Sequence, residues 1–222
     1  KRRGNLLAFN RRYRNIAVDP REMSFQEVWL RGGDAMAESG KRLHYDGCLE
    51  RDRSWGEYED TWTLYMGYDP ATGSRTRFAA FSAFVVVGQK ENDEDIFLVD
   101  YLKDQLDYSR QVDHLLDGSA AHGIKGFMSL YPIKTCTLEK NDHGMFFTGD
   151  DRVRPWIDRG TIVPSYTGTN KLEPDTGVPA LGPLVEHGKL HIPYKDAADM
   201  RKSEVLITDM LEFHPARDKR DL

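Results

Sequence analysis

Hydrophobic and aromatic residues gather in three segments in the first half of the chain, and turn-forming residues separate them. The first segment, 62–68, reads Trp-Thr-Leu-Tyr-Met-Gly-Tyr and ends at Asp69 and Pro70. The second is the long apolar run 77–88, and the third covers 95–101. The stretches between them, Pro-Ala-Thr-Gly and Glu-Asn-Asp-Glu, are typical turn sequences. Three successive strands joined by short turns predict an antiparallel meander.

The second half of the chain alternates between helical and strand patterns. Helices are predicted at 105–116, 142–156, 179–186 and 196–213, and short strands at 135–138, 161–164 and 189–193. The last helix is expected to turn four apolar side chains inward: Val205, Leu206, Met210 and Leu211. A meander followed by alternating helices and strands predicts an α/β fold, with a mixed sheet flanked by helices.

The first 60 residues have a different character. Six of the first 14 are Lys or Arg and form a basic arm. Ser24 and Glu27 have the spacing of a capping box ahead of Val-Trp-Leu, so a short helix is predicted, ended by Gly32 and Gly33. Residues 34–60 are polar and irregular, as expected of a linker or of an extension that wraps around the domain. We therefore expect an arm and linker at 1–60, followed by one folded domain at 61–222.

Composition narrows the class of protein. Hydrophobic residues make up 39% and charged residues 30%, and the mean hydropathy is −0.62, which is typical of a soluble chain with a core. The longest apolar region is interrupted by Ser82, so no membrane span is predicted. Two cysteines are too few for a disulfide framework or a four-thiolate zinc site. The net charge of −5 argues against a protein that coats nucleic acid without regard to sequence. Acidic residues that cluster in the fold can, however, form a metal site.

Common catalytic motifs are absent from this sequence. It contains no Gly-x-x-x-x-Gly-Lys phosphate-binding loop, no Gly-x-Ser-x-Gly nucleophile elbow and no His-Glu-x-x-His zinc motif. Its seven histidines are scattered, and neither cysteine has a histidine placed to activate it. Carboxylates at the ends of predicted strands are the remaining candidates for chemistry.

Two such carboxylates stand out, Asp69 before the turn at Pro70 and Glu139 directly after Thr-Cys-Thr-Leu. A third, Asp221 or Asp218, follows the last predicted helix. Acids at the ends of neighbouring strands can converge at one sheet edge, where their repulsion favours a hard cation such as Mg²⁺ or Mn²⁺. Each acid also has a plainer interpretation, Asp69 as part of an ordinary turn and Glu139 as an acid at a helix N-terminus.

Several short motifs follow one another along the chain in a characteristic order. They read Met-Gly-Tyr-Asp-Pro-Ala at 66–71, Leu-Glu-Lys-Asn at 138–141, Val-Arg-Pro-Trp at 153–156, Tyr-Thr-Gly-Thr-Asn-Lys at 166–171, Pro-Asp-Thr-Gly-Val at 174–178 and Leu-Gly-Pro-Leu-Val-Glu-His-Gly-Lys-Leu-His-Ile-Pro at 181–193. Together they resemble the nuclease domain of tailed-bacteriophage large terminase subunits, especially those of actinobacterial phages and prophages. Segment 9–18 resembles the end of the preceding ATPase part. Because the chain lacks an initiator Met, we expect that ATPase upstream of Lys1.

The resemblance implies a ribonuclease H-like fold that cuts double-stranded DNA with two magnesium or manganese ions. It matches Asp69 and Glu139 with the first two catalytic, metal-binding acids. It matches Asp221 with the third, although Arg220 replaces a second Asp that is common in that motif, so Asp218 stays as the alternative.

Two lysines are candidate contacts for DNA phosphates. Lys140 directly follows Glu139, and Lys171 lies in a predicted loop, 166–176, that could follow the DNA backbone. Each is equally compatible with an ordinary solvated surface lysine.

As the C-terminal part of a large terminase, the chain would cut DNA during viral genome packaging in the cytoplasm of the bacterial host. The expected partners are double-stranded DNA, the ATPase domain of the same polypeptide, the portal and the small terminase, in a homo-oligomeric motor without a membrane. Two other functions stay open. The chain could be another ribonuclease H-like DNA enzyme, such as a recombinase or resolvase, or a non-catalytic DNA- or portal-docking module.

Overall fold

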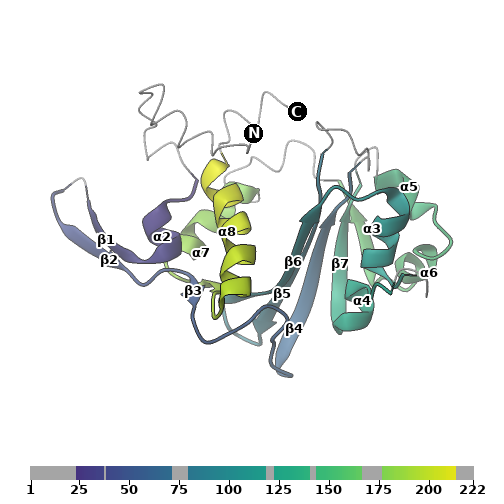
Figure 1. Cartoon of the computed structure of the whole chain (residues 1–222), viewed down its shortest axis with the longest axis horizontal. Coiled ribbons are helices and arrows are strands. Elements are labelled where there is room, and N and C mark those ends of the chain that lie inside the picture. The colour runs from purple at the N-terminus through teal and green to yellow at the C-terminus, as the bar shows by residue number, and fades with distance from the viewer. Residues whose placement is uncertain are drawn as a thin grey trace. The chain divides into compact units, whose positions relative to one another are not determined.

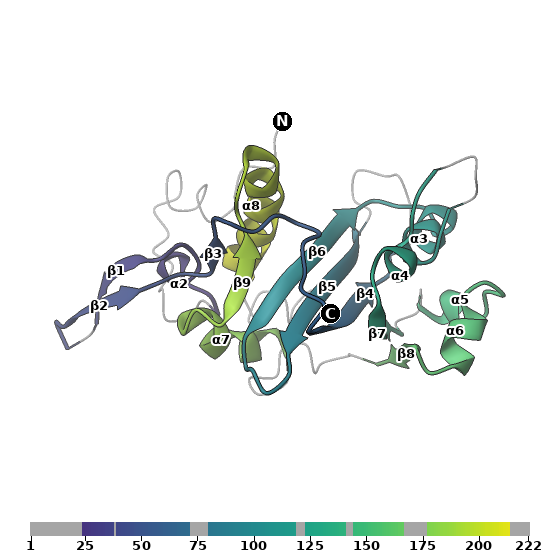
Figure 2. The same ribbon diagram turned by 90° about the horizontal axis from the view of Figure 1, so that it is seen from below.

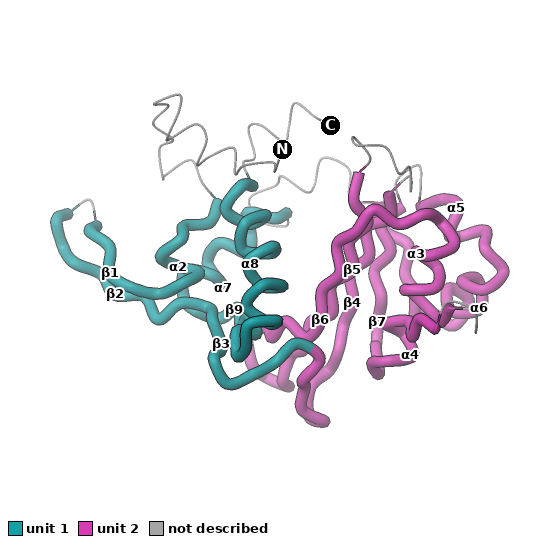
Figure 3. Tube along the Cα trace, viewed as in Figure 1, with its two compact units in different colours: residues 1–55, 169–222 teal, residues 56–168 magenta. Residues whose placement is uncertain are grey.

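The computed structural model describes residues 24–37, 39–71, 80–118, 123–140, 144–166 and 177–213. The chain separates into two compact units, one of residues 56–168 and the other of residues 1–55 with 169–222 (Figure 3). Residues 169–222 cluster with residues 1–55 and not with the strands that precede them in the sequence.

The unit of residues 56–168 is built on a mixed sheet with the strand order β6-β5-β4-β7-β8 (Figure 2). Its strands are β4 (Trp62–Asp69), β5 (Ser82–Lys90), β6 (Ile96–Asp104), β7 (Ile133–Glu139) and β8 (Ile162–Ser165). Strand β5 is antiparallel to β4 and β6, whereas β7 runs parallel to β4 and β8 parallel to β7. The predicted α/β fold is confirmed, since an antiparallel meander continues into parallel strands as in a ribonuclease H-like sheet.

Alternating burial along β4 and β5 builds the core of this unit. Successive side chains of a strand point to opposite faces, and Leu64, Met66 and Tyr68 are all buried on one of them. Phe84 of β5 lies on the same face, where its ring stacks on that of Tyr68 with 4.2 Å between centroids. Helices cover this face (Figure 1): α3 (Tyr108–Leu115), α4 (Phe127–Leu130), α5 (Gly144–Thr148) and α6 (Arg154–Asp158).

Two features of these helices differ from the prediction. The single helix predicted over 142–156 is wrong, because α5 and α6 are separate. Between them the carboxylate of Asp150 accepts a hydrogen bond from the backbone N–H of Arg152 at 2.7 Å, a local bond that competes with helix formation. Helix α4 was not predicted, since four residues are too few to display a helical period.

The other unit contains the remaining described elements. They are α2 (Glu27–Arg31), β1 (Gly33–Met36), β2 (Arg42–Tyr45), β3 (Leu49–Glu50), the 3-10 helix η4 (Val178–Leu181), α7 (Gly182–Glu186), β9 (Leu190–Pro193) and α8 (Ala197–Glu212). Strands β1 and β2 form an antiparallel hairpin, and β3 pairs in parallel with β9. The irregular linker predicted over 34–60 is therefore wrong. The hairpin has no fully buried residue, so its sequence lacks the apolar alternation that marks a strand.

Of the two sequence signals that predicted the ends of α2, the one at the C-terminal end is confirmed and the one at the N-terminal end is wrong. The helix ends as predicted at Gly32, whose φ of 79° suits glycine. The capping box predicted from Ser24 and Glu27 is not formed, because Gln26 is the N-cap residue and no side chain caps the helix.

Helix α8 starts as predicted, with the carboxylate of Asp196 accepting hydrogen bonds from the backbone at its first turn. Its buried stripe, however, consists of Asp199, Ser203 and Ile207. Val205, predicted to face inward, is 50% exposed, and Leu206, Met210 and Leu211 are half-buried. The indole N–H of Trp55 donates to Ser203 Oγ at 3.0 Å, which allows a polar residue on the buried face of α8. Because that face is partly polar, the sequence does not show the apolar period of a helix there.

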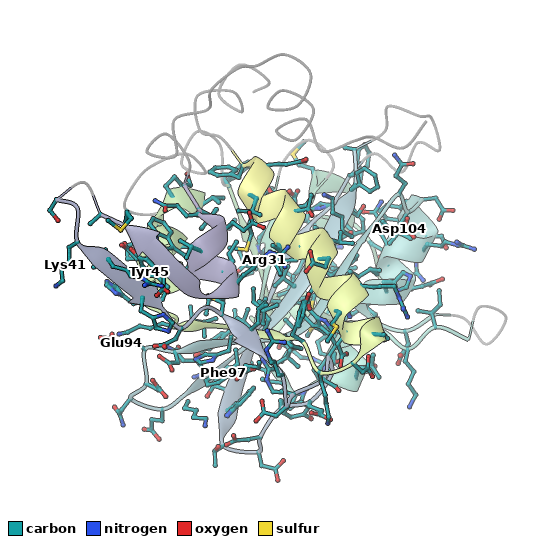
Figure 4. All side chains as sticks on the ribbon, turned by 60° about the vertical axis from the view of Figure 1, so that its left-hand side comes forward. Arg31, Lys41, Tyr45, Glu94, Phe97 and Asp104 are labelled. Atoms are coloured by element: carbon teal, nitrogen blue, oxygen red, sulfur yellow. The ribbon has the colours of Figure 1, made fainter. Side chains whose placement is uncertain are left out.

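Arg31 links α2 to α8 within this unit (Figure 4). Its Nη1 and Nη2 donate to the two carboxylate oxygens of Glu204, each at 2.7 Å. The hydroxyl of Tyr194 donates to the same carboxylate, also at 2.7 Å. The hydrogen bond from Arg31 holds the pKa of Glu204 below its usual range. The three donors therefore favour the ionised form of this carboxyl group.

Replacing Glu204 by Gln is expected to lower the free energy of unfolding by about 1 kcal/mol at neutral pH, the upper range for a partly exposed ion pair. A carboxyl group with a depressed folded pKa stabilises the protein above its unfolded pKa, about 4.3 for Glu, and stops doing so as the pH falls through the folded pKa. The difference between wild type and Glu204→Gln should therefore disappear on acidification. Urea unfolding across the acidic range checks this, with Glu91→Gln in an exposed turn as the control. A difference that stayed constant with pH would contradict it.

No helix among the described residues is both long enough and apolar enough to span a membrane.

Candidate functional site

Asp69 and Glu139 are the last residues of β4 and β7, which are adjacent and parallel. The register pairs Tyr68 of β4 with Leu138 of β7. Asp69 and Glu139, the next residue of each strand, therefore lie side by side. Tyr68 and Leu138 are buried in the core, which directs the two following side chains to the opposite face, where both are half-buried. Neighbouring strands lie about 4.8 Å apart. The structure therefore brings the two predicted acids together at one edge of the sheet.

The other strands of this unit also meet at that edge. Strand β6 ends there at Asp104, which pairs with Ser82 at the start of β5, and β8 ends there at Ser165, which pairs with Glu139. We call this the C-terminal sheet edge, defined by Asp69, Ser82, Asp104, Glu139 and Ser165.

Asp104 is an acid of this edge that sequence reasoning missed (Figure 4). The predicted strand ended at Tyr101, three residues too early, so the acid at its true end was not considered. Asp104 is exposed and its carboxylate accepts a hydrogen bond from the backbone N–H of Gln105 at 2.7 Å. It lies two strands away from Asp69, about 10 Å by the spacing of strands. It is therefore no close neighbour of the Asp69 carboxylate.

Buried polar groups anchor the chain where it leaves β4. The backbone N–H of Ala71 donates to Ser82 Oγ at 3.2 Å, and the carbonyl of Ala71 accepts from Gln111 Nε2 at 2.9 Å. Gln111 Nε2 also donates to the carbonyl of Leu106 at 2.8 Å, and its Oε1 accepts from the hydroxyl of Tyr68 at 2.9 Å. Asp69 and Pro70 thus lie between two residues, Tyr68 and Ala71, that Gln111 holds.

Gln111 is a functional candidate that the sequence did not reveal. It is 1% exposed on α3, whereas a glutamine in a helical pattern is normally assigned to the surface. Burial raises the pKa of Tyr68 well above its usual value, so the hydroxyl stays protonated and donates a hydrogen bond to Gln111 Oε1. Both hydrogens of the Gln111 amide group are used, which makes this side chain a fixed connection between α3 and the end of β4.

Lys140, the predicted phosphate contact, follows Glu139 at the same edge. Its backbone N–H donates to the carbonyl of Ser165 at 2.7 Å, which extends the pairing of β7 and β8 by one residue. Its Nζ lies 5.2 Å from the ring centroid of Tyr166, within cation–π distance. The backbone and the side chain of Lys140 are therefore both held beside Glu139.

The other predicted site residues, Asp218, Asp221 and Lys171, lie outside the described residues. Within the described part of the chain, no three His, Cys, Asp or Glu residues are grouped so that they could hold a metal ion. Two carboxylates such as Asp69 and Glu139 can hold Mg²⁺ when water or substrate phosphate completes its coordination. Their donor chemistry fits Mg²⁺ or Mn²⁺, which prefer carboxylate oxygens.

The two cysteines do not offer an alternative site. Both are buried, and burial raises the pKa of Cys48 and the pKa of Cys136 to about 12 each. The thiolate is the form that binds metals and attacks electrophiles, and these thiols stay protonated at neutral pH.

Comparison with known protein families, with curated proteins and with solved structures finds no match for this chain. Its function therefore has to be argued from the residues at the C-terminal sheet edge.

Proposed function

We propose that the chain is the nuclease part of a large terminase from a tailed phage or prophage, a metal-dependent endonuclease that cuts double-stranded DNA during genome packaging. One observation carries the proposal: Asp69 and Glu139 end two adjacent parallel strands at the same level. The terminase-like motifs at 66–71 and 138–141 contain these same two acids. The sequence motifs and the strand register are separate observations, and both point to Asp69 and Glu139.

Asp69, Glu139 and a C-terminal acid, Asp221 or Asp218, would hold two magnesium or manganese ions. Such ions supply a water nucleophile at neutral pH and stabilise the charge on the leaving oxygen. Gln111 and Ser82 hold the backbone of Ala71, two residues after Asp69, and would so help to position the Asp69 carboxylate. Lys140 and Lys171 would contact phosphates, which gives binding that is independent of sequence and sensitive to salt.

In this proposal the chain works in the host cytoplasm as one part of an oligomeric packaging motor. The ATPase domain of the same polypeptide would move the DNA, and the portal and small terminase would position it.

The test is cleavage of supercoiled plasmid by the whole chain. We expect nicked and then linear plasmid with Mn²⁺ or Mg²⁺, and intact plasmid in excess chelator. Manganese should also raise the melting temperature, because a ligand that binds only the folded state stabilises it by mass action. Undiminished cleavage in chelator would rule out the metal mechanism. Cleavage confined to branched DNA would favour a resolvase, and binding without cleavage in either metal would favour a docking module.

A further inference from the structure

The exposed aromatic residues are concentrated at one place in the fold. Of the residues that the structure describes, four aromatic side chains are exposed: Phe81 at 42%, Tyr108 at 38%, Phe146 at 69% and Tyr166 at 69%. All four belong to the unit of residues 56–168. Exposed aromatic residues that gather at one site of a protein mark a binding surface more often than chance scatter does.

Each of the four lies where the chain enters or leaves the C-terminal sheet edge. Phe81 directly precedes β5, Tyr108 begins α3 just after β6, Phe146 lies on α5 just after β7, and Tyr166 directly follows β8. Figure 1 shows α3 and α5 beginning at this end of the strands. We call these four residues the aromatic rim.

Two lysines accompany the rim, and in the strand order they lie on either side of Asp69. Lys103 Nζ, at the end of β6, lies 5.3 Å from the ring centroid of Phe81. Lys140 Nζ, at the end of β7, lies 5.2 Å from that of Tyr166. In the strand order, Phe81 and Lys103 belong to β5 and β6, and Tyr166 follows β8, so Asp69 on β4 lies between the two aromatic–lysine pairs.

The spacing of these pairs suits a nucleic-acid strand. From β5 to β8 there are three steps between neighbouring strands, which amount to about 14 Å. At the rise of a stacked strand, about 3.4 Å per nucleotide, the interval corresponds to about four nucleotides, and an extended unpaired strand crosses it with fewer. A strand laid across the edge would present phosphates to both lysines and pass over the acids between them.

The part of the rim formed by Tyr108 and Phe146 is held in place by the core behind it. The Tyr108 ring lies 4.7 Å from that of the buried Phe147, and its hydroxyl donates to Asp150 at 2.8 Å and to the carbonyl of Phe146 at 3.5 Å. Tyr108 and Phe146 therefore adjoin one another on two helices packed against the sheet. A rigid aromatic surface loses little conformational entropy when it binds a planar ligand.

We propose that the aromatic rim stacks unpaired bases of a DNA strand whose phosphates meet Lys103 and Lys140, so that the site prefers single-stranded or locally melted DNA to intact duplex. Base faces are covered by neighbouring bases in a duplex and become available only when a strand is unpaired. Aromatic side chains interleaved with lysines are the pattern that binds such strands. The inference rests on the proposed function and specifies the form of DNA that its site accepts.

Binding of the whole chain to a labelled oligothymidine, compared with a duplex of equal length and measured in chelator over a range of salt, tests this proposal. The wild type should bind the single strand more tightly. Tyr166→Ala should weaken that binding about 5- to 150-fold, the loss expected for one base–aromatic stack. Tyr166→Trp, which keeps a stacking ring, should restore it. Lys140→Ala should instead lower the slope of log affinity against log salt by about 0.7, whereas the Tyr166 variants leave that slope unchanged.

The matched control is Leu130→Ala. Leu130 is 46% exposed and is the last residue of α4, and two residues separate it from the start of β7. It therefore lies near the opposite end of that strand from Glu139. Its replacement should not change affinity for either DNA, and equal melting temperatures should confirm that all variants fold. Unchanged single-strand affinity of both Tyr166→Ala and Phe146→Ala would overturn the proposal. An equal loss for duplex and single strand would overturn the preference for unpaired bases.

The outcome is independent of cleavage, because binding is measured without metal. A chain that binds single strands through the rim and never cuts plasmid would contradict the nuclease proposal alone. A chain that cuts plasmid while its rim variants bind normally would contradict the rim alone, and the rim would then be assigned to a protein partner.

Discussion

Asp69→Asn is expected to abolish metal-dependent plasmid cleavage while leaving DNA binding in chelator intact or slightly stronger. The amide keeps the size of the carboxyl group but removes the charge that a divalent ion needs. Even groups that only orient a metal ligand contribute about 10- to 100-fold, so loss of a ligand itself should reduce the rate by more than about 100-fold. Glu139→Gln should have the same effect, because its strand ends at the same level.

Two neighbouring acids give matched controls for these variants. Asp60→Asn alters an exposed residue just before β4 begins, at the other end of the strand that carries Asp69. Asp104→Asn alters an exposed acid of the C-terminal sheet edge itself, two strands from Asp69. Both should keep most of the cleavage rate. Full activity of Asp69→Asn would mean that this residue only forms a turn, and equal losses at Asp69 and Asp104 would indicate a general effect of edge charge.

Gln111→Leu is expected to lower the free energy of unfolding by about 3 kcal/mol. Leucine fills most of the space, but it leaves the Tyr68 hydroxyl and the carbonyls of Ala71 and Leu106 without their partner, and each unsatisfied buried group costs about 1–3 kcal/mol, with some relief by relaxation. Because Gln111 holds the residues on both sides of Asp69 and Pro70, cleavage should also fall in the fraction that remains folded.

Urea unfolding measures the first effect, and cleavage at a temperature where the variant is folded measures the second. The control is Gln89→Leu, since Gln89 is exposed on β5 and should change stability by less than about 0.5 kcal/mol. Wild-type stability of Gln111→Leu would mean that water replaces the lost bonds. Lowered stability with an unchanged cleavage rate would assign Gln111 to the core and not to positioning Asp69.

Local signals account for the parts of the fold that were predicted correctly. Strand β4 alternates buried and less buried side chains, and α8 begins after Asp196, whose side chain caps the first turn. Both signals act over a few residues. They were sufficient to place Asp69 and Glu139 at the ends of strands, although neither the register nor the adjacency of these strands could be measured from them.

The parts of the fold that were predicted wrongly have a common cause. In each of them, contacts with residues distant in sequence outweigh the local pattern of apolar and polar residues. The hairpin of β1 and β2 lacks apolar alternation, and the inward stripe of α8 carries Asp199 and Ser203 because Trp55 supplies their hydrogen bonds. Gln111 is buried for the same reason, since its partners come from β4 and from the turn that follows it. A polar residue whose partner is distant in sequence looks like a surface residue.

By itself the sequence determined the strands of the meander and the acids at the ends of its first strand and of the strand that follows α4, because alternation and turn chemistry depend on neighbours within a few positions. Only the tertiary structure decided that β7 lies beside β4, so that Asp69 and Glu139 share one edge with Asp104, Lys140 and the aromatic rim. The physical reason is that strand order and register arise from burying one face of every strand in a common core, and that core joins residues from all parts of the unit.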